Sequence, residues 1–369
     1  NGTVLTIDAA GTYLLSGSCT DGSVKIKKGT TGVRLILSGL SLTSADTAPI
    51  TCNKSSEVVI VAADGTENVL TDAAANNDES NSGNENAENA VIKCKDGSAV
   101  TLCGAGTLTL NAYGKNGIKS GATTAEEGEA SLTIRELTLS INASVNDAIN
   151  AEQYLAVESG TLNLATADVA LHCDLIMDIG AEGTEGPTIA IAEACEGIEA
   201  AALSIIGDIS IVCTDDCLNA ANFDLANYDF AINISGGNVT VWSGGNADNQ
   251  PLDADGTIAI TGGSAGMGMN LSTTQAYVTF GSAGISGTGN MGGHCKPGKN
   301  SVRQPKSDSK VSGNFQPSDD FRPGDMTSNN SMSSGGSAPS DGFGASLISA
   351  GSIMTILDPS GSTVYSADL

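Results

Sequence analysis

Acidic and amide side chains recur along the middle of the chain, each just before a short aliphatic segment. This turn row comprises Asn116, Asn146, Asp147, Asp168, Glu196, Asp215, Asp216, Asp248 and Asn249. Ca²⁺ prefers oxygen ligands and takes about six to eight of them, turn carbonyls included. We therefore expect calcium ligands among these side chains, namely Asp147, Asp168, Asp215, Asp216, Glu196, Asn146 and Asp248. The alternative is that Asp and Asn only cap tight turns, as they do in most proteins.

A second polar set lies inside each aliphatic segment. It comprises Lys93, Lys119, Asn150, His172, Glu199, Asn219 and Asp253. Stacked on one sheet face, such groups form a ladder of hydrogen-bonding sites that suits a long sugar polymer. We expect carbohydrate contacts from Lys119, Asn150, His172, Glu199, Asn219 and Asp253, although any exposed sheet face displays polar side chains.

No catalytic residue is predicted, because no nucleophile, phosphate-loop or dinucleotide motif occurs in the right context.

The charge of the chain restricts its partners. Sixteen Lys and Arg against 42 Asp and Glu give a net charge of −26, which excludes a nucleic-acid backbone as partner. Between Glu136 and Cys295 there is no Lys or Arg at all. The carboxylates of this stretch therefore repel one another, and divalent cations such as Ca²⁺ relieve such repulsion. A merely soluble acidic surface is the alternative.

A repeat organises the elements that must position these side chains. Its core is a small residue, an aliphatic residue, a polar residue and a second small residue. Copies occur at 49–52, 91–94, 117–120, 148–151, 170–173, 197–200, 217–220 and 251–254. Two further alternating segments follow most copies, for example Leu132-Thr133-Ile134 and Leu137-Thr138-Leu139. Alternation with period two predicts strands with one buried face.

Strands this short bury their faces only by stacking on the next coil. The sequence therefore predicts an all-β fold, a right-handed parallel β-helix with three sheets and an N-terminal cap. The aliphatic and second small residues are expected to point inward and the polar residue outward. Cys52 and Cys94 then lie in adjacent coils if residues 76–89 form a loop, which leaves both a disulfide and a pair of buried thiols open.

Composition divides the chain into three parts: a β-helix domain over 1–288, a Gly/Ser/Pro/Asn-rich segment over 289–345, and a strand pair over 346–369. The middle segment carries Lys296, Lys299, Arg303, Lys306, Lys310 and Arg322. Its positive charge beside an acidic body predicts that it folds back or contacts a neighbouring molecule, so self-association through residues 296–322 is expected.

Several phrases resemble a known family: Gly11-Thr12-Tyr13-Leu14-Leu15-Ser16-Gly17, Asp64-Gly65-Thr66-Glu67-Asn68, Asn116-Gly117-Ile118-Lys119-Ser120, Asn146-Asp147-Ala148-Ile149-Asn150 and Glu196-Gly197-Ile198-Glu199. Over about residues 2–281 the chain is similar to secreted bacterial carbohydrate-binding β-helix proteins, whose fold is like that of pectate lyases. The resemblance implies binding of calcium, cellulose and pectic polysaccharide. Two coils depart from the family pattern. Cys217 replaces Gly after Asp216, and Asp168 lacks a second acid beside it.

These observations favour an exported, non-catalytic polysaccharide-binding protein that depends on Ca²⁺, with pectic glycans or cellulose as ligands. We expect an extracellular or cell-surface bacterial protein whose signal peptide has been removed, and no membrane span. Two alternatives stay open. One is a calcium-dependent polysaccharide lyase, for which Lys119 is the candidate base. The other is a self-assembling extracellular fibre or matrix protein.

Overall fold

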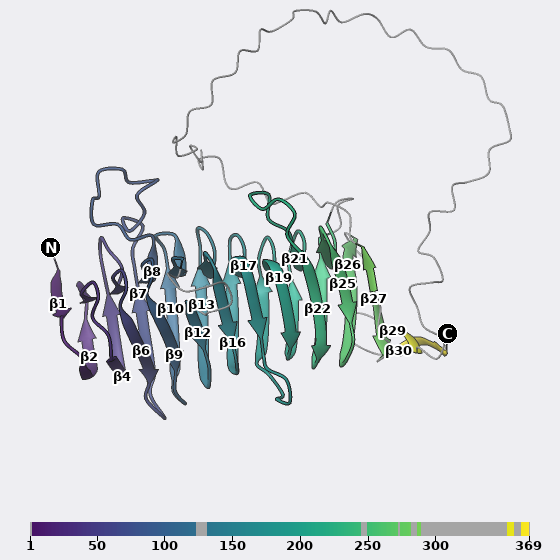
Figure 1. Cartoon of the computed structure of the whole chain (residues 1–369), viewed down its shortest axis with the longest axis horizontal. Coiled ribbons are helices and arrows are strands. Elements are labelled where there is room, and N and C mark those ends of the chain that lie inside the picture. The colour runs from purple at the N-terminus through teal and green to yellow at the C-terminus, as the bar shows by residue number, and fades with distance from the viewer. Residues whose placement is uncertain are drawn as a thin grey trace, which may run out of the picture.

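The computed structural model describes residues 2–122, 131–244, 249–271, 274–281, 286–288, 353–357 and 363–368, with side chains as far as Met267. Within these residues all regular structure is β and there is no helix. Strands β1 to β26 pair with one another only in parallel. They stack along the long axis of the molecule, from β1 at the N-terminal end (Figure 1). The predicted all-β, parallel class is therefore confirmed.

The strands fall into three columns of hydrogen-bonded neighbours. The first column contains β1 (Thr3–Ile7), β3 (Gly22–Ile26), β5 (Ile50–Cys52), β8 (Ala90–Cys94), β11 (Asn116–Ser120), β14 (Ile149–Ala151), β21 (Leu218–Ala220) and β24 (Leu252–Ala254), with the first residues of β17 (Leu171–Ile179) and β19 (Ile198–Ile206) between β14 and β21.

The second column begins with β2 (Gly11–Cys19) and β4 (Val33–Thr43). It continues through β6 (Glu57–Ala62), β9 (Ala99–Cys103), β12 (Leu132–Ile134), β15 (Tyr154–Val157), the later residues of β17 and β19, β22 (Ala231–Gly236) and β25 (Thr257–Ile260), and ends with antiparallel β28 (Ser286–Thr288).

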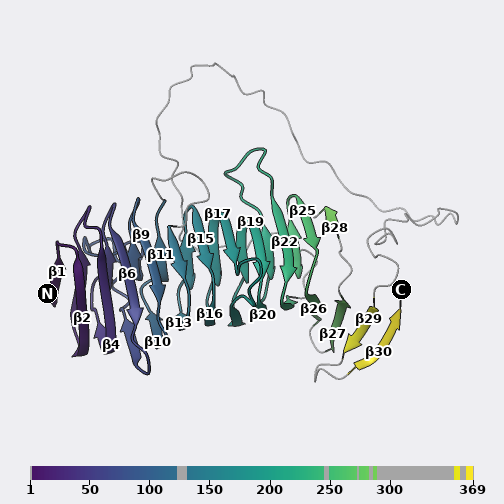
Figure 2. The ribbon, with the colours of Figure 1, turned by 60° about the horizontal axis from the view of Figure 1, so that its bottom comes forward.

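The third column takes the later residues of β2 and β4. It continues through β7 (Glu67–Thr71), β10 (Thr107–Ala112), β13 (Leu137–Ala143), β16 (Gly160–Thr166), β18 (Thr188–Glu193), β20 (Asp208–Val212), β23 (Asn238–Ser243) and β26 (Ser264–Leu271). Antiparallel β27 (Thr274–Gly281), β29 (Ile353–Leu357) and β30 (Thr363–Asp368) extend it at the end opposite to β1 (Figure 2).

The core lies between the columns and is built from the inward positions of each strand. In the first column the aliphatic position is fully buried in successive coils, as Ile92, Ile118, Ile149, Leu171 and Ile198 show. The second small position is buried too, so the predicted inward pair is confirmed. One reason for the small residue before the aliphatic one is visible at Gly197. A Cβ atom there would lie 2.3 Å from the carbonyl oxygen of Cys217 in the next coil.

The insertion between β7 and β8 leaves the stacking undisturbed. Cys52 of β5 lies directly opposite Cys94 of β8, so the two residues lie on adjacent, hydrogen-bonded strands. Both are free thiols with 0% exposure, so the structure has the buried-thiol alternative. The predicted segment 289–345, including the basic residues of 296–322, lies outside the described residues.

Truncating one inward-facing side chain tests whether the core lies between the three columns. Ile198→Ala removes a side chain with 0% exposure and leaves a cavity, so we expect the free energy of unfolding to fall by about 2–5 kcal/mol. Val145→Ala is a matched surface control, since Val145 is 46% exposed, and its effect should stay within about 0.5 kcal/mol. Urea denaturation of both variants measures the difference, and equal effects would contradict a core at Ile198.

Candidate functional site

In-register pairing aligns the polar residues of the first column into one continuous outer row. It runs Thr6, Lys25, Thr51, Lys93, Lys119, Asn150, His172, Glu199, Asn219 and Asp253. All the predicted carbohydrate contacts therefore lie in one line. The row is longer than the sequence indicated, since Thr6, Lys25 and Thr51 extend it. Its charge changes sign at His172, with lysines before that residue and carboxylates after it.

The last two rungs are buried although they occupy outward positions. Asn219 and Asp253 are each 3% exposed, and the Asn219 amide donates a hydrogen bond of 3.3 Å to Glu196 Oε2. Neither side chain is open to a sugar, contrary to the expectation from their position. They instead face the carboxylates of the turn row. Lys119, Asn150, His172 and Glu199 are half-buried and stay accessible.

His172 is held between two carboxylates. Its Nδ1 lies 2.8 Å from Glu199 Oε2 and its Nε2 lies 2.8 Å from Asp174 Oδ1. Burial opposes the charged imidazolium, but the bonds to Asp174 and Glu199 prevail and raise the pKa of His172 well above its usual range. Strand pairing supplies Glu199, and Asp174 lies two residues beyond His172 in the same strand, on the same face.

The turn row forms two overlapping groups around Glu196. The first contains Asp147 and Asp168. Asn150 and the Val169 amide donate hydrogen bonds to Asp147, which is 4% exposed. Burial, followed by the charges of Asp147 and Glu196, raises the pKa of Asp168 to about 7. Asn146 lies one residue away and donates to Asn116 Oδ1 at 2.7 Å, so it contributes mainly its backbone to this region.

The second group contains Asp215, Asp216 and Asp253 together with Asn219. Burial is the main cause that raises the pKa of Asp216 to about 7, and the charges of Asp215, Asp253 and Glu196 add to it. Asp216 Oδ1 accepts a hydrogen bond from the Gln250 amide at 2.5 Å. Asp216 Oδ2 and Asn219 Oδ1, in contrast, are buried oxygens without a hydrogen-bond partner. Such orphaned acceptors are costly unless a further group satisfies them.

The donors of the second group suit a hard cation. Carboxylate and amide oxygens are calcium ligands, and two of the oxygens lack a partner. Across the described parts of the chain, no three His, Cys, Asp or Glu side chains lie so that they could hold a metal ion by themselves. An ion would therefore recruit amide and backbone oxygens as well as carboxylates. Asp248, the remaining predicted ligand, lies outside the described residues.

The cysteines of this region act structurally. Cys213 and Cys217 are buried, with their sulfur atoms 2.8 Å apart, and both are free thiols. They flank Asp215 and Asp216. Cys195 is disulfide-bonded, and its carbonyl accepts a hydrogen bond of 2.8 Å from the Asp215 amide. Together these contacts hold the acidic turn in place.

Aromatic side chains gather in the loop after β21, which sequence reasoning did not single out. Phe223 is 74% exposed, and the rings of Tyr228 and Phe230 lie 5.7 Å apart in a tilted arrangement. Asn222 anchors the loop by donating to the carbonyl of Asp174 at 2.7 Å. The loop thus adjoins the acidic half of the outer row. The sequence does contain a signal for this loop: three aromatic residues lie within residues 223–230 of a chain that has few aromatic residues.

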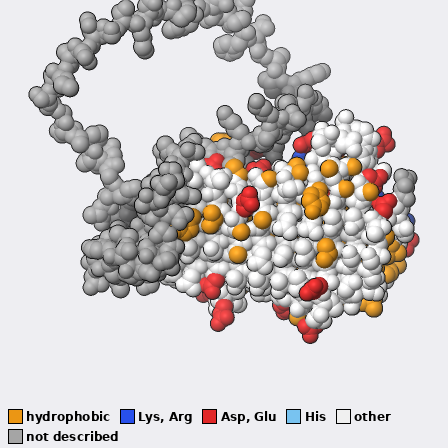
Figure 3. Space-filling view, turned by 180° about the vertical axis from the view of Figure 1, so that it is seen from behind, with side chains coloured by type: hydrophobic (Ala, Val, Ile, Leu, Met, Phe, Trp, Pro, Cys, Tyr) orange, Lys and Arg blue, Asp and Glu red, His pale blue; other side chains and the backbone are white. Residues whose placement is uncertain are grey.

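Seen from behind the view of Figure 1, the described part of the surface shows Asp and Glu side chains scattered over it, with Lys and Arg visible only near its margins (Figure 3). In the described residues no helix is long and apolar enough to cross a membrane.

The raised pKa values determine how stability depends on pH in the absence of divalent cations. Folded Asp168 and Asp216 have a pKa of about 7 and keep their protons up to that pH, whereas the ordinary pKa of an Asp carboxyl is 3.8. The folded state therefore binds more protons between these values, so its stability falls as pH rises from about 4 to 7. His172 also makes stability fall as pH rises, because the imidazolium that its carboxylate partners stabilise loses its proton at higher pH.

We expect Asp216→Asn to flatten this pH dependence and to raise the unfolding midpoint at pH 8 in chelator, because an amide carries no buried charge. Asp64→Asn, at an exposed turn, is the control and should behave as the unmodified protein. Thermal unfolding from pH 5 to 8 measures both. A midpoint that rises with pH in the unmodified protein would contradict the assignment of buried, protonated carboxyls.

Comparison with known proteins agrees with a sugar-binding surface. The family model of carbohydrate-binding domain-containing proteins matches residues 1–291. A carbohydrate-binding domain-containing protein of Acetivibrio thermocellus is 37% identical over 113 residues, which is 30% of this chain and 38% of that relative. No solved structure matches the chain. Because the family match covers most of its length, the chain belongs to the family of carbohydrate-binding domain-containing proteins.

Proposed function

We propose that this chain is an exported, non-catalytic polysaccharide-binding protein that folds as a right-handed parallel β-helix and uses Ca²⁺ at its acidic turn row. Family membership supports the carbohydrate ligand. The three columns of parallel strands support the β-helix. The single observation that carries the calcium proposal is the pair of partnerless buried oxygens, Asp216 Oδ2 and Asn219 Oδ1, beside the carboxylate of Glu196.

Glu196, Asp216 and Asn219 would hold the ion. The negative charges of the neighbouring Asp215 and Asp253 would stabilise the bound cation. Bound Ca²⁺ supplies positive charge that stabilises the ionised carboxylates and gives an anionic or hydroxyl-rich glycan a point of attachment. The second group contains no Lys, Arg or His, so no side chain there already supplies that charge. The first group differs, since the doubly bonded His172 supplies a cation to Asp147 and Asp168.

The accessible part of the outer row offers the sugar contacts. Asn150, His172 and Glu199 are half-buried polar side chains that lie on successive strands of the first column. Rungs repeat at about 4.8 Å, so a glycan laid along the stack meets a polar group at each step. Pectic glycans or cellulose are the proposed ligands. The aromatic loop over 223–230 adds apolar surface of the kind on which sugar rings pack.

Calorimetric titration with Ca²⁺ tests the ion site. We expect binding to the unmodified chain, an affinity that rises with pH through about 7 because the ion needs ionised Asp216, and a raised unfolding midpoint. Glu196→Gln with Asp216→Asn should weaken binding roughly tenfold or more. The exposed control Asp64→Asn should leave it unchanged.

A glycan array with Ca²⁺ and with chelator tests the ligand. Binding of acidic or cellulosic glycans that weakens in chelator is the expected result. Absence of binding to every glycan in both conditions would contradict the proposed function, whereas equal binding in both would contradict only its dependence on calcium.

A further inference from the structure

The outer row carries lysines along its N-terminal half, and none of these lysines makes an ion pair with a described residue. Lys25, Lys93 and Lys119 lie on one line, with Thr51 between the first two. Lys93 and Lys119 are direct neighbours on adjacent strands, so their side chains leave the sheet about 4.8 Å apart. Like charges directly opposite each other destabilise a sheet, which makes this pair unusual in a chain of charge −26.

Other lysines of the same region are paired. Lys54 lies 2.6 Å from Asp96, Lys95 lies 2.7 Å from Glu88, and Lys115 lies 2.5 Å from Glu79. Within the described part of the chain, the three lysines of the row make no ion pair. Acidic partners were therefore available in this region, and these three lysines are without one.

The surroundings of the pair are partly shielded from water. Lys93 and Lys119 are half-buried, and burial, then the charge of Lys119, lower the pKa of Lys93. The charges of Glu152 and Glu88 favour the charged form of Lys93, but neither carboxylate forms an ion pair with it among the described residues, and Glu88 is engaged by Lys95. At the neighbouring position Thr51 is 0% exposed, and its hydroxyl has no hydrogen-bond partner among the described residues. Cations in such a setting gain from an anionic ligand.

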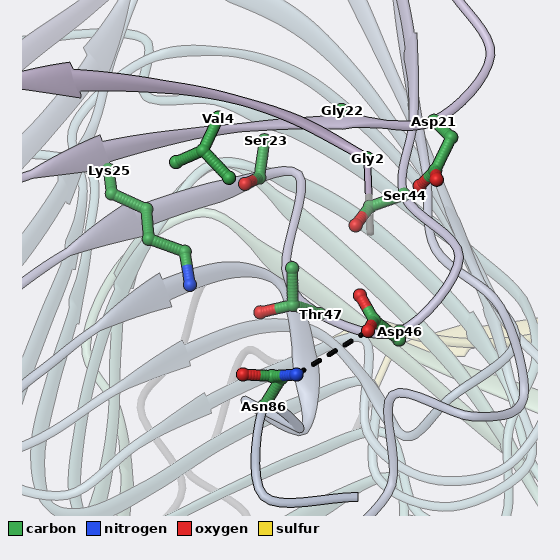
Figure 4. Close-up of a pocket in the computed structure, with 10 residues that line it drawn as sticks. All are labelled: Gly2, Val4, Asp21, Gly22, Ser23, Lys25, Ser44, Asp46, Thr47 and Asn86. Carbon is green, nitrogen blue, oxygen red and sulfur yellow. Dashed lines mark hydrogen bonds between the residues drawn. The ribbon is translucent and has the colours of Figure 1, made fainter.

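The far end of the row opens into a small pocket. Its volume is about 110 Å³, and Lys25, Ser23, Thr47 and Asn86 contribute to its lining. Figure 4 shows these side chains around one hollow, with the Asn86 amide 3.5 Å from Asp46 Oδ2. Asp21 and Asp46 also line it, so the positive charge there is balanced. The unbalanced part of the row is the pair of Lys93 and Lys119.

We propose that Lys93 and Lys119 form a subsite that binds the carboxylate groups of an acidic oligosaccharide directly, without a metal ion. This inference rests on the proposed polysaccharide-binding function. It implies that the two halves of the row bind the same glycan in different ways. Carboxylates of the glycan bind the lysines at the N-terminal half, whereas the C-terminal half requires Ca²⁺ because its own groups are acidic. Chains of uronic acids fit both halves, and neutral glycans gain nothing at the lysines.

Calorimetric titration with trigalacturonate in the presence of chelator tests the subsite, with cellotriose as the neutral probe. The unmodified chain should bind trigalacturonate in a salt-sensitive manner. Lys93→Gln with Lys119→Gln should weaken this binding roughly tenfold, and Lys93→Arg with Lys119→Arg should retain it. Lys27→Gln with Lys28→Gln is the matched control, because these exposed lysines carry the same charge outside the row, and it should bind as the unmodified chain. Circular dichroism and the unfolding midpoint verify the fold of each variant.

Two results would overturn the subsite: no binding of trigalacturonate in chelator by the unmodified chain, or equal weakening in the row variant and the control. A parallel titration with Ca²⁺ separates this from the proposed function. Calcium-dependent glycan binding without any binding in chelator removes the subsite and leaves the proposed function standing. Binding in chelator that Ca²⁺ does not strengthen supports the subsite and contradicts the calcium proposal.

Discussion

Register between parallel strands is the constraint on which every other feature of this molecule depends. First-column strands such as β14 and β21 are three residues long, too short to be stable alone. They persist because each is hydrogen-bonded to a neighbour on either side in the stack. A slip of one residue would move the inward Ile and Ala to the surface and the polar rung into the core. Burial of the aliphatic position therefore fixes the register, and the register fixes the site.

In-register stacking also brings side chains of like charge close together on neighbouring strands. The groups that offset their repulsion differ along the chain. At the centre, His172 lies between Asp174 and Glu199 and offsets the surrounding negative charge. Farther along, burial and then the charges of Asp215, Asp253 and Glu196 raise the pKa of Asp216 to about 7. Towards the N-terminus, two lysines face each other. The lysines at one end of the row thus form no ion pair with a described residue, and the carboxylates of the second group at the other end have no described cationic side chain among them.

Much of this arrangement could be predicted from the sequence because it follows from periodicity. The small-aliphatic-polar-small repeat identified the inward Ile149 and Ala151 and the outward Asn150, and the alternating segments identified the other two columns. What could not be predicted depends on contacts made outside the repeat. Asn219 and Asp253 occupy outward positions yet are buried, and the two hydrogen bonds of His172, to Asp174 and Glu199, are not visible in the repeat itself. The pairing of Lys95 with Glu88, which leaves Lys93 without a partner, depends on the insertion before β8.

Stacked register gives the outer row two ends that differ in charge, and we propose that cations bind only at the acidic end. An anomalous diffraction map from crystals grown with a lanthanide in place of Ca²⁺ would locate them. We expect an ion in contact with Glu196, Asp216 and Asn219, and none near Lys93 or Lys119. An ion elsewhere on the stack with that group left empty, or no ion at all, would contradict it.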